Sequence, residues 1–128
     1  MRKRYLRIAD AGAKGRGVFT ATAIPSGKLI ETAPVIVLSA ADRLLLDRTA
    51  LHDYIFEWGE DGKSCCMALG WVPVYNHSYA SNCEYFMDFD AALIHVKTIR
   101  AVKAGEELTI NYNGDWNDPK KIWFDAAG

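Results

Sequence analysis

The sequence predicts a mainly β fold, and three observations carry that prediction. Short runs rich in β-branched and aromatic residues recur along the whole chain. Glycine, proline and asparagine separate these runs at short intervals, as they do between hairpin strands. Only one stretch, 39–46, reads as a helix, with Ser39 as its cap and Asp42 three residues later. Many short strands with one or two short helices are typical of a mainly β domain.

The strands are expected in a fixed order along the chain. Pro34 stands between two of them and predicts a sheet edge or a break there, because proline cannot donate a ladder hydrogen bond. Asp61-Gly62-Lys63 is a hairpin turn signal, and Asn76 to Asn82 is predicted to be a compact polar turn. The expected strands cover residues 5–8, 18–20, 29–31, 35–38, 54–58, 65–69, 84–89, 93–99 and 108–112.

Length and charge limit the classes of function. The 128 residues fit one domain spanning 1–128, with a core of about 5–116 and a closing segment at 117–128. The net charge of −1 gives no indication of a nucleic-acid or membrane partner, so neither is expected. The basic N-terminus lacks a following apolar stretch, which argues against a signal peptide. Three cysteines, two of them adjacent, do not make a disulfide framework, so an intracellular, reducing compartment is expected.

Three separated motifs carry the chemical content of the chain. They are Gly15-Arg16-Gly17, Asn76-His77-Ser78 and the segment from Glu107 to Tyr112. A lone G-x-G is most often an ordinary loop, although glycine also lets backbone approach a ligand closely. The terminal segment alone reads as a hairpin strand that ends at a surface tyrosine.

The Asn-His-Ser motif has several readings of its own. It matches a glycosylation sequon, which the missing signal peptide disfavours. His77 could join cysteines in a zinc site, but no cysteine pair has C-x-x-C spacing, so no metal is expected. Asn and Ser could also serve only to hold a turn by bonding nearby backbone.

In this order and spacing, the three motifs resemble the SET domain, the fold of S-adenosylmethionine-dependent protein lysine methyltransferases. The resemblance runs from about residue 5 to 116, and Asn82 matches a second, structural asparagine of the family signature. It implies several small sheets and a C-terminal pseudoknot, in which the last strand is tucked beneath the loop from Asn76 to Asn82. The chain looks most like the minimal single-domain members, including a small viral form that acts as a dimer, so a homodimer is expected. For a viral or eukaryotic protein the compartment would be cytoplasm or nucleus.

The resemblance also implies roles for particular residues. Tyr112 would be the catalytic residue, at the end of a narrow lysine channel. The residues implied to bind S-adenosylmethionine are Gly15, Arg16, Gly17, Tyr54, Asn76, His77, Tyr112 and Trp116. Those implied to line the substrate channel are Tyr54, Phe56, Tyr75 and Trp116.

The residue types suit such a reaction. Methyl transfer to an amine is an in-line displacement, and alignment alone removes much of its barrier. A tyrosine hydroxyl can orient the amine, while aromatic walls hold a methylated ammonium by cation–π contact. The expected partner is a basic protein or peptide lysine substrate, because acidic residues such as Asp53, Glu57, Asp88 and Asp90 are available for it.

Two features depart from the family pattern. Asn113 stands between Tyr112 and Gly114, where the family commonly has Tyr-Gly, and this shifts the register of Trp116. The zinc-binding cysteine cluster that often follows the domain is missing, since no cysteine occurs after Cys83. The alternative function is a catalytically inactive SET-like module that binds a peptide or a cofactor.

Overall fold

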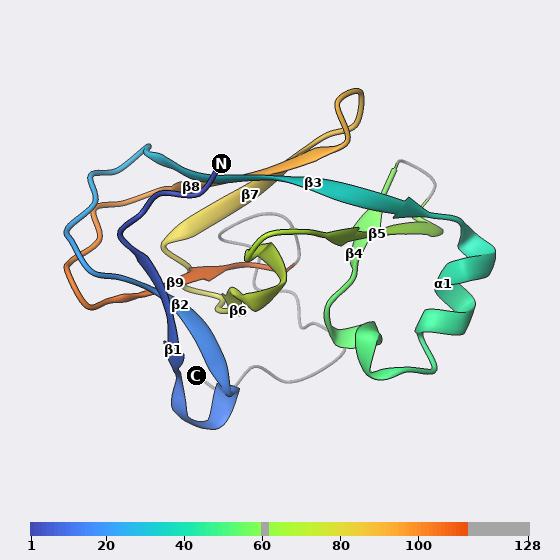
Figure 1. Ribbon diagram of the computed structural model, residues 1–128, viewed down its shortest axis with the longest axis horizontal. Coiled ribbons are helices and arrows are strands. Elements are labelled where there is room, and N and C mark those ends of the chain that lie inside the picture. Colours follow the sequence, from blue (N-terminus) through green and yellow to red (C-terminus); the bar gives the residue numbers. More distant parts are fainter. Residues whose placement is uncertain (60–61, 113–128) are drawn as a thin grey trace.

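The computed structural model describes residues 1–59 and 62–112, and within these ranges the fold is mainly β (Figure 1). Nine strands make two sheets, and one α-helix, α1 (Ala40–Leu46), follows the third strand. The strands are β1 Leu6–Asp10, β2 Arg16–Thr20, β3 Leu29–Leu38, β4 Phe56–Trp58, β5 Ser64–Ala68, β6 Asn76–His77, β7 Cys83–Asp88, β8 Leu93–Thr98 and β9 Glu107–Ile110. Three 3-10 turns are η1 Gly12–Lys14, η2 Ala50–Asp53 and η3 Val72–Val74.

The two sheets differ in how their strands are connected. The larger sheet has the order β4-β5-β3-β8-β7, and each of its neighbouring pairs is antiparallel. Its hairpins β4–β5 and β7–β8 join strands that are close in sequence, as the turn signals predict. The smaller sheet has the order β1-β2-β9-β6, in which β9 pairs antiparallel with β2 and parallel with β6. A strand from the end of the chain therefore lies inside this sheet.

The expected edge or break at Pro34 is wrong. β3 runs unbroken from Leu29 to Leu38 and is the central strand of the larger sheet. The proline is tolerated because it stands just outside the residues of β3 that pair with β5. β5 pairs only with residues 35–38 of β3. The Leu69 N–H, beyond the end of β5, still donates to the Pro34 carbonyl at 3.0 Å. In a strand the N and O of one residue point to the same side, so the missing donor faces the end of β5 rather than a continuing ladder.

The Asn76 to Asn82 segment is only partly the polar turn that its composition predicts. Asn76 and His77 form β6, which pairs in parallel register with Thr109 and Ile110 of β9. A parallel pair cannot form between strands joined by a short hairpin, so only the folded chain brings these residues together.

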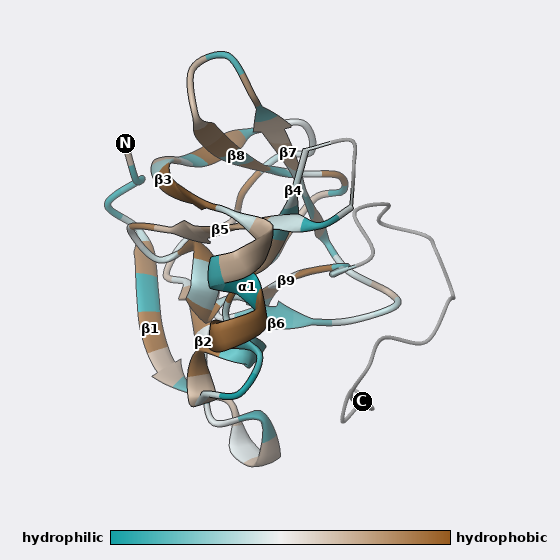
Figure 2. Cartoon of the chain, turned by 90° about the vertical axis from the view of Figure 1, so that its right-hand side faces the viewer, coloured by the Kyte–Doolittle hydropathy of each residue, from teal (hydrophilic) through white to brown (hydrophobic). Residues whose placement is uncertain are grey.

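The predicted helix cap is confirmed. The Ser39 hydroxyl accepts a hydrogen bond from the Asp42 N–H at 3.1 Å, which satisfies one of the free amides at the start of α1. The helix itself buries no residue, and Leu44 and Leu45 are 69% and 63% exposed. Figure 2 shows α1 facing the viewer, with hydrophobic positions on its surface.

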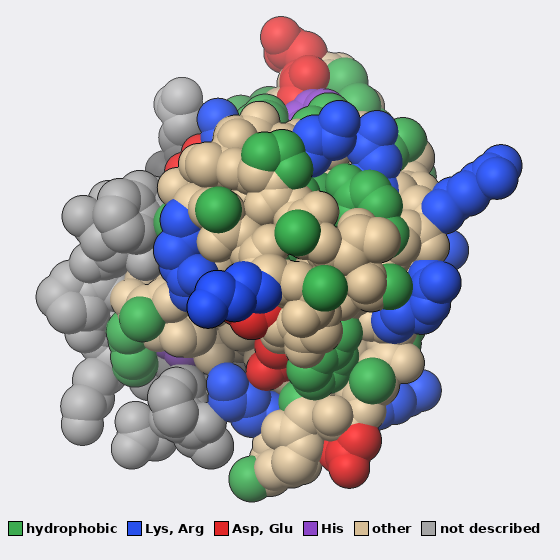
Figure 3. Space-filling model, turned by 90° about the vertical axis from the view of Figure 1, so that its left-hand side faces the viewer, with side chains coloured by type: hydrophobic (Ala, Val, Ile, Leu, Met, Phe, Trp, Pro, Cys, Tyr) green, Lys and Arg blue, Asp and Glu red, His purple; other side chains and the backbone are tan. Residues whose placement is uncertain are grey.

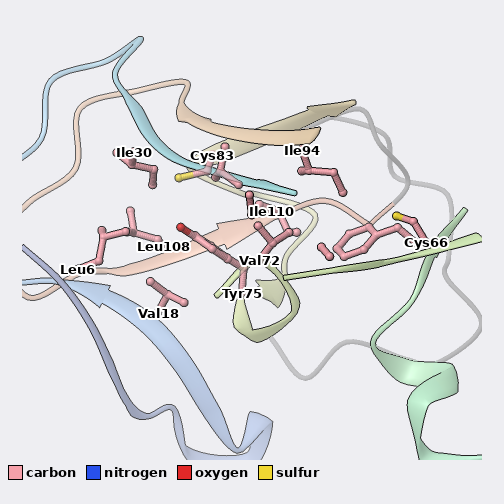
Figure 4. Close-up of a cluster of buried hydrophobic side chains, with 14 of the residues drawn as sticks. Leu6, Val18, Ile30, Cys66, Val72, Tyr75, Cys83, Ile94, Leu108 and Ile110 are labelled. Atoms are coloured by element: carbon pink, nitrogen blue, oxygen red, sulfur yellow. The ribbon is translucent and has the colours of Figure 1, made fainter. Parts of the chain in front are cut away.

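The hydrophobic core lies where the two sheets meet (Figure 4). Side chains of β2, β3, β8 and β9 meet there, among them Val18, Ile30, Ile94 and Leu108, and each is fully buried. Burial of aliphatic side chains of this size stabilises the fold by about 1.5–3 kcal/mol each. This core fixes β9 against the larger sheet.

Asn82 holds β9 by bonding the backbone of that strand. Its Oδ1 accepts from the Thr109 N–H at 2.9 Å, and its Nδ2 donates to the Glu107 carbonyl at 2.8 Å. The side chain is 2% exposed, so these bonds are made away from water. Asn82 thus serves the structural role that the sequence motif implies.

We expect Asn82→Ala to lower the free energy of unfolding by about 2 kcal/mol or more, because two backbone groups of β9 lose their partner in a buried place. Asn82→Asp keeps the acceptor for the Thr109 N–H but loses the donor to the Glu107 carbonyl, and should also destabilise the fold. Urea denaturation measures both. Ser78→Ala is the matched control, since its hydroxyl accepts only a local bond from the exposed Ala80 N–H. A loss with Asn82→Ala no larger than with Ser78→Ala would contradict the assignment.

Candidate active site

An open cleft of about 940 Å³ lies between the β1–β2 loop, η2, η3 and the end of β9. It is lined by segments that are far apart in the sequence. Its lining residues are Ala9, Asp10, Lys14, Gly15, Arg16, Asp53, Tyr54, Pro73, Val74, Asn76 and Tyr112. The cleft is therefore lined by the glycine loop, by Asn76 of the Asn-His-Ser motif and by Tyr112.

Gly15 and Gly17 are required for different reasons. Gly15 has φ 82°, in the left-handed region that favours glycine, and its N–H closes η1 on the Gly12 carbonyl. Gly17 lies inside β2 rather than in the loop, and here a side chain has no room. A Cβ at Gly17 would fall 2.8 Å from Asn76 Nδ2 and closer still to a Glu107 carboxylate oxygen.

The Asn76 carboxamide is oriented by two acceptors. Its Nδ2 donates to the Arg16 carbonyl at 3.1 Å and to Glu107 Oε2 at 2.7 Å. The other Glu107 oxygen lies 3.9 Å from the Lys14 ammonium. Because both bonds use the amide nitrogen, the Asn76 oxygen remains as an acceptor at the edge of the cleft.

His77 connects β6 to the end of β9. The ring is 3% exposed, and its Nδ1 accepts the Tyr112 N–H at 2.9 Å. Burial lowers the pKa of His77 below the usual 6.5, and the nearby Lys14 charge lowers it further. A nitrogen that accepts a hydrogen bond carries no proton, so the neutral ring holds its proton on Nε2. Within residues 1–59 and 62–112, that buried Nε2 has no hydrogen-bond partner.

Tyr112 is held at three points. Its N–H donates to His77, its carbonyl accepts the Tyr85 hydroxyl at 3.1 Å, and its own hydroxyl donates to the Tyr75 carbonyl at 2.7 Å. Burial raises the pKa of Tyr112 to about 12, with further increases from the neighbouring Tyr54, Asp53 and Glu107. The hydroxyl is therefore neutral near pH 7, and its proton is directed at a carbonyl. It can orient a ligand through its oxygen lone pairs, but it is not arranged to act as a base.

Several aromatic rings lie close to the Tyr112 ring. Phe56 meets Tyr85 edge to face with 5.1 Å between ring centroids, and meets Tyr112 at 6.2 Å. Tyr54 is 48% exposed and lines the cleft. The Tyr112 ring thus lies beside the apolar ring of Phe56.

The structure brings together most of the residues that the sequence implies. Gly15, Arg16, Tyr54, Asn76 and Tyr112 all line the cleft, and Gly17, His77 and Phe56 lie directly behind it. Trp116 lies outside the described residues.

The assignment of the Tyr75 side chain to the channel needs a correction. Its ring is fully buried in the core, and its hydroxyl donates to the buried Glu31 carboxylate at 3.0 Å. Figure 4 shows this ring among the core side chains. What Tyr75 presents to the site is its backbone carbonyl, which accepts the Tyr112 hydroxyl. The direction of a side chain depends on its position in the local backbone, and the Tyr75 ring points into the core.

Sequence reasoning missed several residues of the site, notably Tyr85, Glu107 and Lys14. Tyr85 carried a usable signal: it alternates with Cys83 and Met87 on one face of a predicted strand, and a buried tyrosine needs a partner for its hydroxyl. Glu107 carried a weaker one, because a carboxylate at a turn usually faces solvent. Its role depends on the parallel pairing of β6 with β9, which no local pattern indicates.

Among residues 1–59 and 62–112, no group of three or more His, Cys, Asp or Glu side chains could hold a metal ion. In the same ranges, no helix has the length and apolar character that crossing a membrane requires.

Residues 15–113 match the sequence profile of the SET domain. The chain belongs to the SET domain family. Over 121 residues it is 33% identical to the fission yeast (Schizosaccharomyces pombe) histone-lysine N-methyltransferase specific for H3 lysine-37, covering 94% of this chain and 77% of that protein. A crystal structure of a Plasmodium falciparum protein assigned as a histone methyltransferase superposes with a TM-score of 0.65, at 22% identity, over 89% of this chain and 97% of that one. The fold is thus that of a SET domain, the domain of lysine methyltransferases.

We expect His77 to remain neutral, with its proton on Nε2, at pH values where an ordinary histidine is already half protonated. Because the folded pKa is lowered, protonation opposes folding, and the stability due to neutral His77 is lost as pH falls below about 6.5. Two-dimensional ¹H–¹⁵N correlation spectra of the histidine rings report both tautomer and titration. His52 and His95 provide reference signals in the same spectra, and His77→Gln assigns the His77 signal. A ring that carries its proton on Nδ1, or titrates above 6.5, would contradict the bond to Tyr112.

Proposed function

We propose that this chain transfers a methyl group from S-adenosylmethionine to a lysine side chain of a protein, with the cleft holding the cofactor and Tyr112 at its reacting end. The observation that carries the proposal is Tyr112 itself. This chain is a SET domain. Beside its glycine loop, the Tyr112 hydroxyl is fixed by the Tyr75 carbonyl, and the Tyr112 backbone is fixed by His77 and Tyr85. An inactive binding module would not need a tyrosine held at three points.

The cleft fits a cofactor of this kind. S-adenosylmethionine, when bound, supplies a methyl group activated by a sulfonium charge. Gly15 and Arg16 offer backbone at the edge of the cleft, and the oriented Asn76 oxygen can accept from an ammonium group. Tyr54 offers an exposed ring for stacking. We assign these residues, with the His77 backbone, to cofactor binding.

The chemistry needs alignment more than proton transfer. Tyr112 donates to Tyr75, so its oxygen can accept a hydrogen bond from the incoming amine and hold it on the line of attack. The amine must first be neutral, although a free lysine has a pKa of about 10.4. A channel of aromatic rings disfavours the charged amine and lowers that pKa. Phe56 and Tyr54 are the described residues that we assign to this channel.

The substrate that we propose is a basic peptide, in keeping with the histone specificity of the yeast relative. Asp53 and Tyr54 line the cleft next to one another, and Glu57 follows on β4. These carboxylates can receive the cations that flank the target lysine. The three free cysteines are all buried, which suits a reducing compartment that also contains basic substrate proteins.

Two further features of the proposal concern architecture. We propose that β9 passes beneath the segment from Asn76 to Asn82 as a pseudoknot, supported by the parallel pairing of β6 with β9 and the bonds of Asn82.

We also propose a homodimer, supported by the exposed Leu44 and Leu45 of α1 and the exposed Ile36 and Val37 of β3. Light scattering that gives the 14.3 kDa monomer mass at high concentration would exclude the dimer.

Incubation with radiolabelled S-adenosylmethionine and core histones tests the activity, and labelled lysine is the expected product. We then expect Tyr112→Phe to lower kcat about 100-fold or more, because the amine loses its alignment. Cofactor affinity should change little, since the glycine loop and Asn76 remain. Tyr5→Phe is the matched control, a half-buried tyrosine of the N-terminal segment that is not among the residues lining the cleft. A Tyr112→Phe protein with near wild-type kcat would remove this residue from the mechanism.

Asn76→Ala should show the opposite emphasis. The cofactor loses one acceptor, and Glu107 and the Arg16 carbonyl lose their shared donor, so we expect the Kd to rise about tenfold or more. Isothermal titration calorimetry measures this, and wild-type binding should survive a chelator. Binding that is lost on chelation would point to a metal, and an unchanged Kd in Asn76→Ala would remove that residue from the cofactor site.

A further inference from the structure

Lysine and arginine gather at one end of the molecule. They come from three segments: the N-terminal residues, the turn before β3 and the turn between β8 and β9. Figure 3 looks at this end and shows several separate groups of Lys and Arg side chains around the face, with some Asp and Glu among them. The residues that make this basic face are Lys3, Arg4, Arg7, Lys28, Arg100 and Lys103.

The fold brings these segments side by side. The Lys3 N–H donates to the Ile30 carbonyl at 3.0 Å, which lays the N-terminal residues along β3. The Gly27 N–H donates to the Thr98 carbonyl at 2.9 Å, and Ile24 forms a bridge with Val102. In Figure 1 the turns before β3 and after β8 lie together at the left, away from α1. Backbone pairing therefore keeps the cations together despite their mutual repulsion.

Most of this charge is not neutralised by neighbouring acids. Arg100 lies 3.4 Å from Glu106, at an exposed position. Within the described ranges, Lys3, Arg4, Lys28 and Lys103 make no ion pair. Asp42, Asp47 and Asp53 lie instead on α1 and after it, at the other end of the molecule. Arg43 and Arg48 lie among these aspartates, so that end carries charges of both signs.

We propose that the basic face binds the phosphate backbone of duplex nucleic acid. Several exposed cations from rigid turns match the repeated charge of a duplex, which attracts proteins mainly through phosphate contacts. Among residues 1–59 and 62–112, the face carries no exposed aromatic side chain on which unpaired bases could stack, since Tyr5 is half-buried. The large apolar residues exposed beside it are Met1 and Leu29, too few for an apolar surface that inserts into a membrane.

This partner differs from the expectation that net charge supports. A value of −1 for the whole chain sums cations and anions wherever they lie, so it conceals the basic face. A nucleic acid at this face would leave the cleft free for a basic peptide. The binding of a nucleic acid and a basic peptide to the same molecule rests on the proposed function, whereas phosphate binding does not.

Fluorescence anisotropy of a fluorescein-labelled 20-base-pair duplex tests the proposal, without cofactor or turnover. We expect binding with a Kd of about 10 µM or less at 50 mM NaCl. If about four cations contact phosphates, the Kd should rise about 100-fold at 200 mM NaCl, because the logarithmic salt slope is close to −0.9 for each contact. No anisotropy change at 100 µM protein, or a Kd that does not depend on salt, would overturn the proposal.

Two single charge reversals locate the contact. Lys28→Glu should weaken duplex binding about tenfold at 50 mM NaCl, whereas Arg48→Glu, an equal change in net charge on the far side of α1, should alter it less than twofold. Equal effects of the two variants would mean that no specific face binds. Methylation of a short peptide by Lys28→Glu should match the wild type, and a loss there would show that the variant damaged the fold rather than the face. Vesicles containing phosphatidylserine are a further arm, and tighter binding to them than to the duplex would assign the face to a membrane instead.

Discussion

The rest of the site depends on the placement of β9 between β2 and β6. β9 is the last described strand, yet it lies inside its sheet, and one side chain, Asn82, bonds its backbone through both ends of its amide. The parallel pairing with β6 then brings His77 to the N–H of Tyr112, two residues after Ile110. A buried amide that satisfies two backbone groups has no apolar substitute. If β9 moved by one residue, both the core face and the site would lose their register.

This placement explains how the site is made rigid with few polar residues. Tyr112 stands two residues after the end of β9, and its backbone and hydroxyl bond to His77, Tyr85 and the Tyr75 carbonyl. Two of these partners are buried aromatic residues, so each fixes a hydrogen bond and contributes to the core at the same time. Tyr75 links this arrangement to the larger sheet, because its hydroxyl reaches Glu31 on β3. Core packing and site geometry therefore cannot be separated here.

The distribution of charge follows from the same topology. Backbone pairing of the N-terminal residues with β3, and of the two neighbouring turns, places cations at one end. α1 and η2 follow β3 at the other end and carry aspartates. The basic end is available to an anionic ligand, and Asp53 is among the residues that line the cleft. Long-range fields of this kind affect association more than stability.

By itself, the sequence determined the strand content, the β4–β5 and β7–β8 hairpins, the capped helix and the three motifs of the SET family. These depend on alternation, turn residues and spacing, which are local properties. Only the tertiary structure decided that Pro34 sits in a central strand, that Tyr75 turns its ring into the core and that Glu107 orients Asn76. It also gathered the basic face, which net charge conceals. The physical reason is common to these cases: each depends on which distant segment lies alongside, and side-chain periodicity does not specify strand partners.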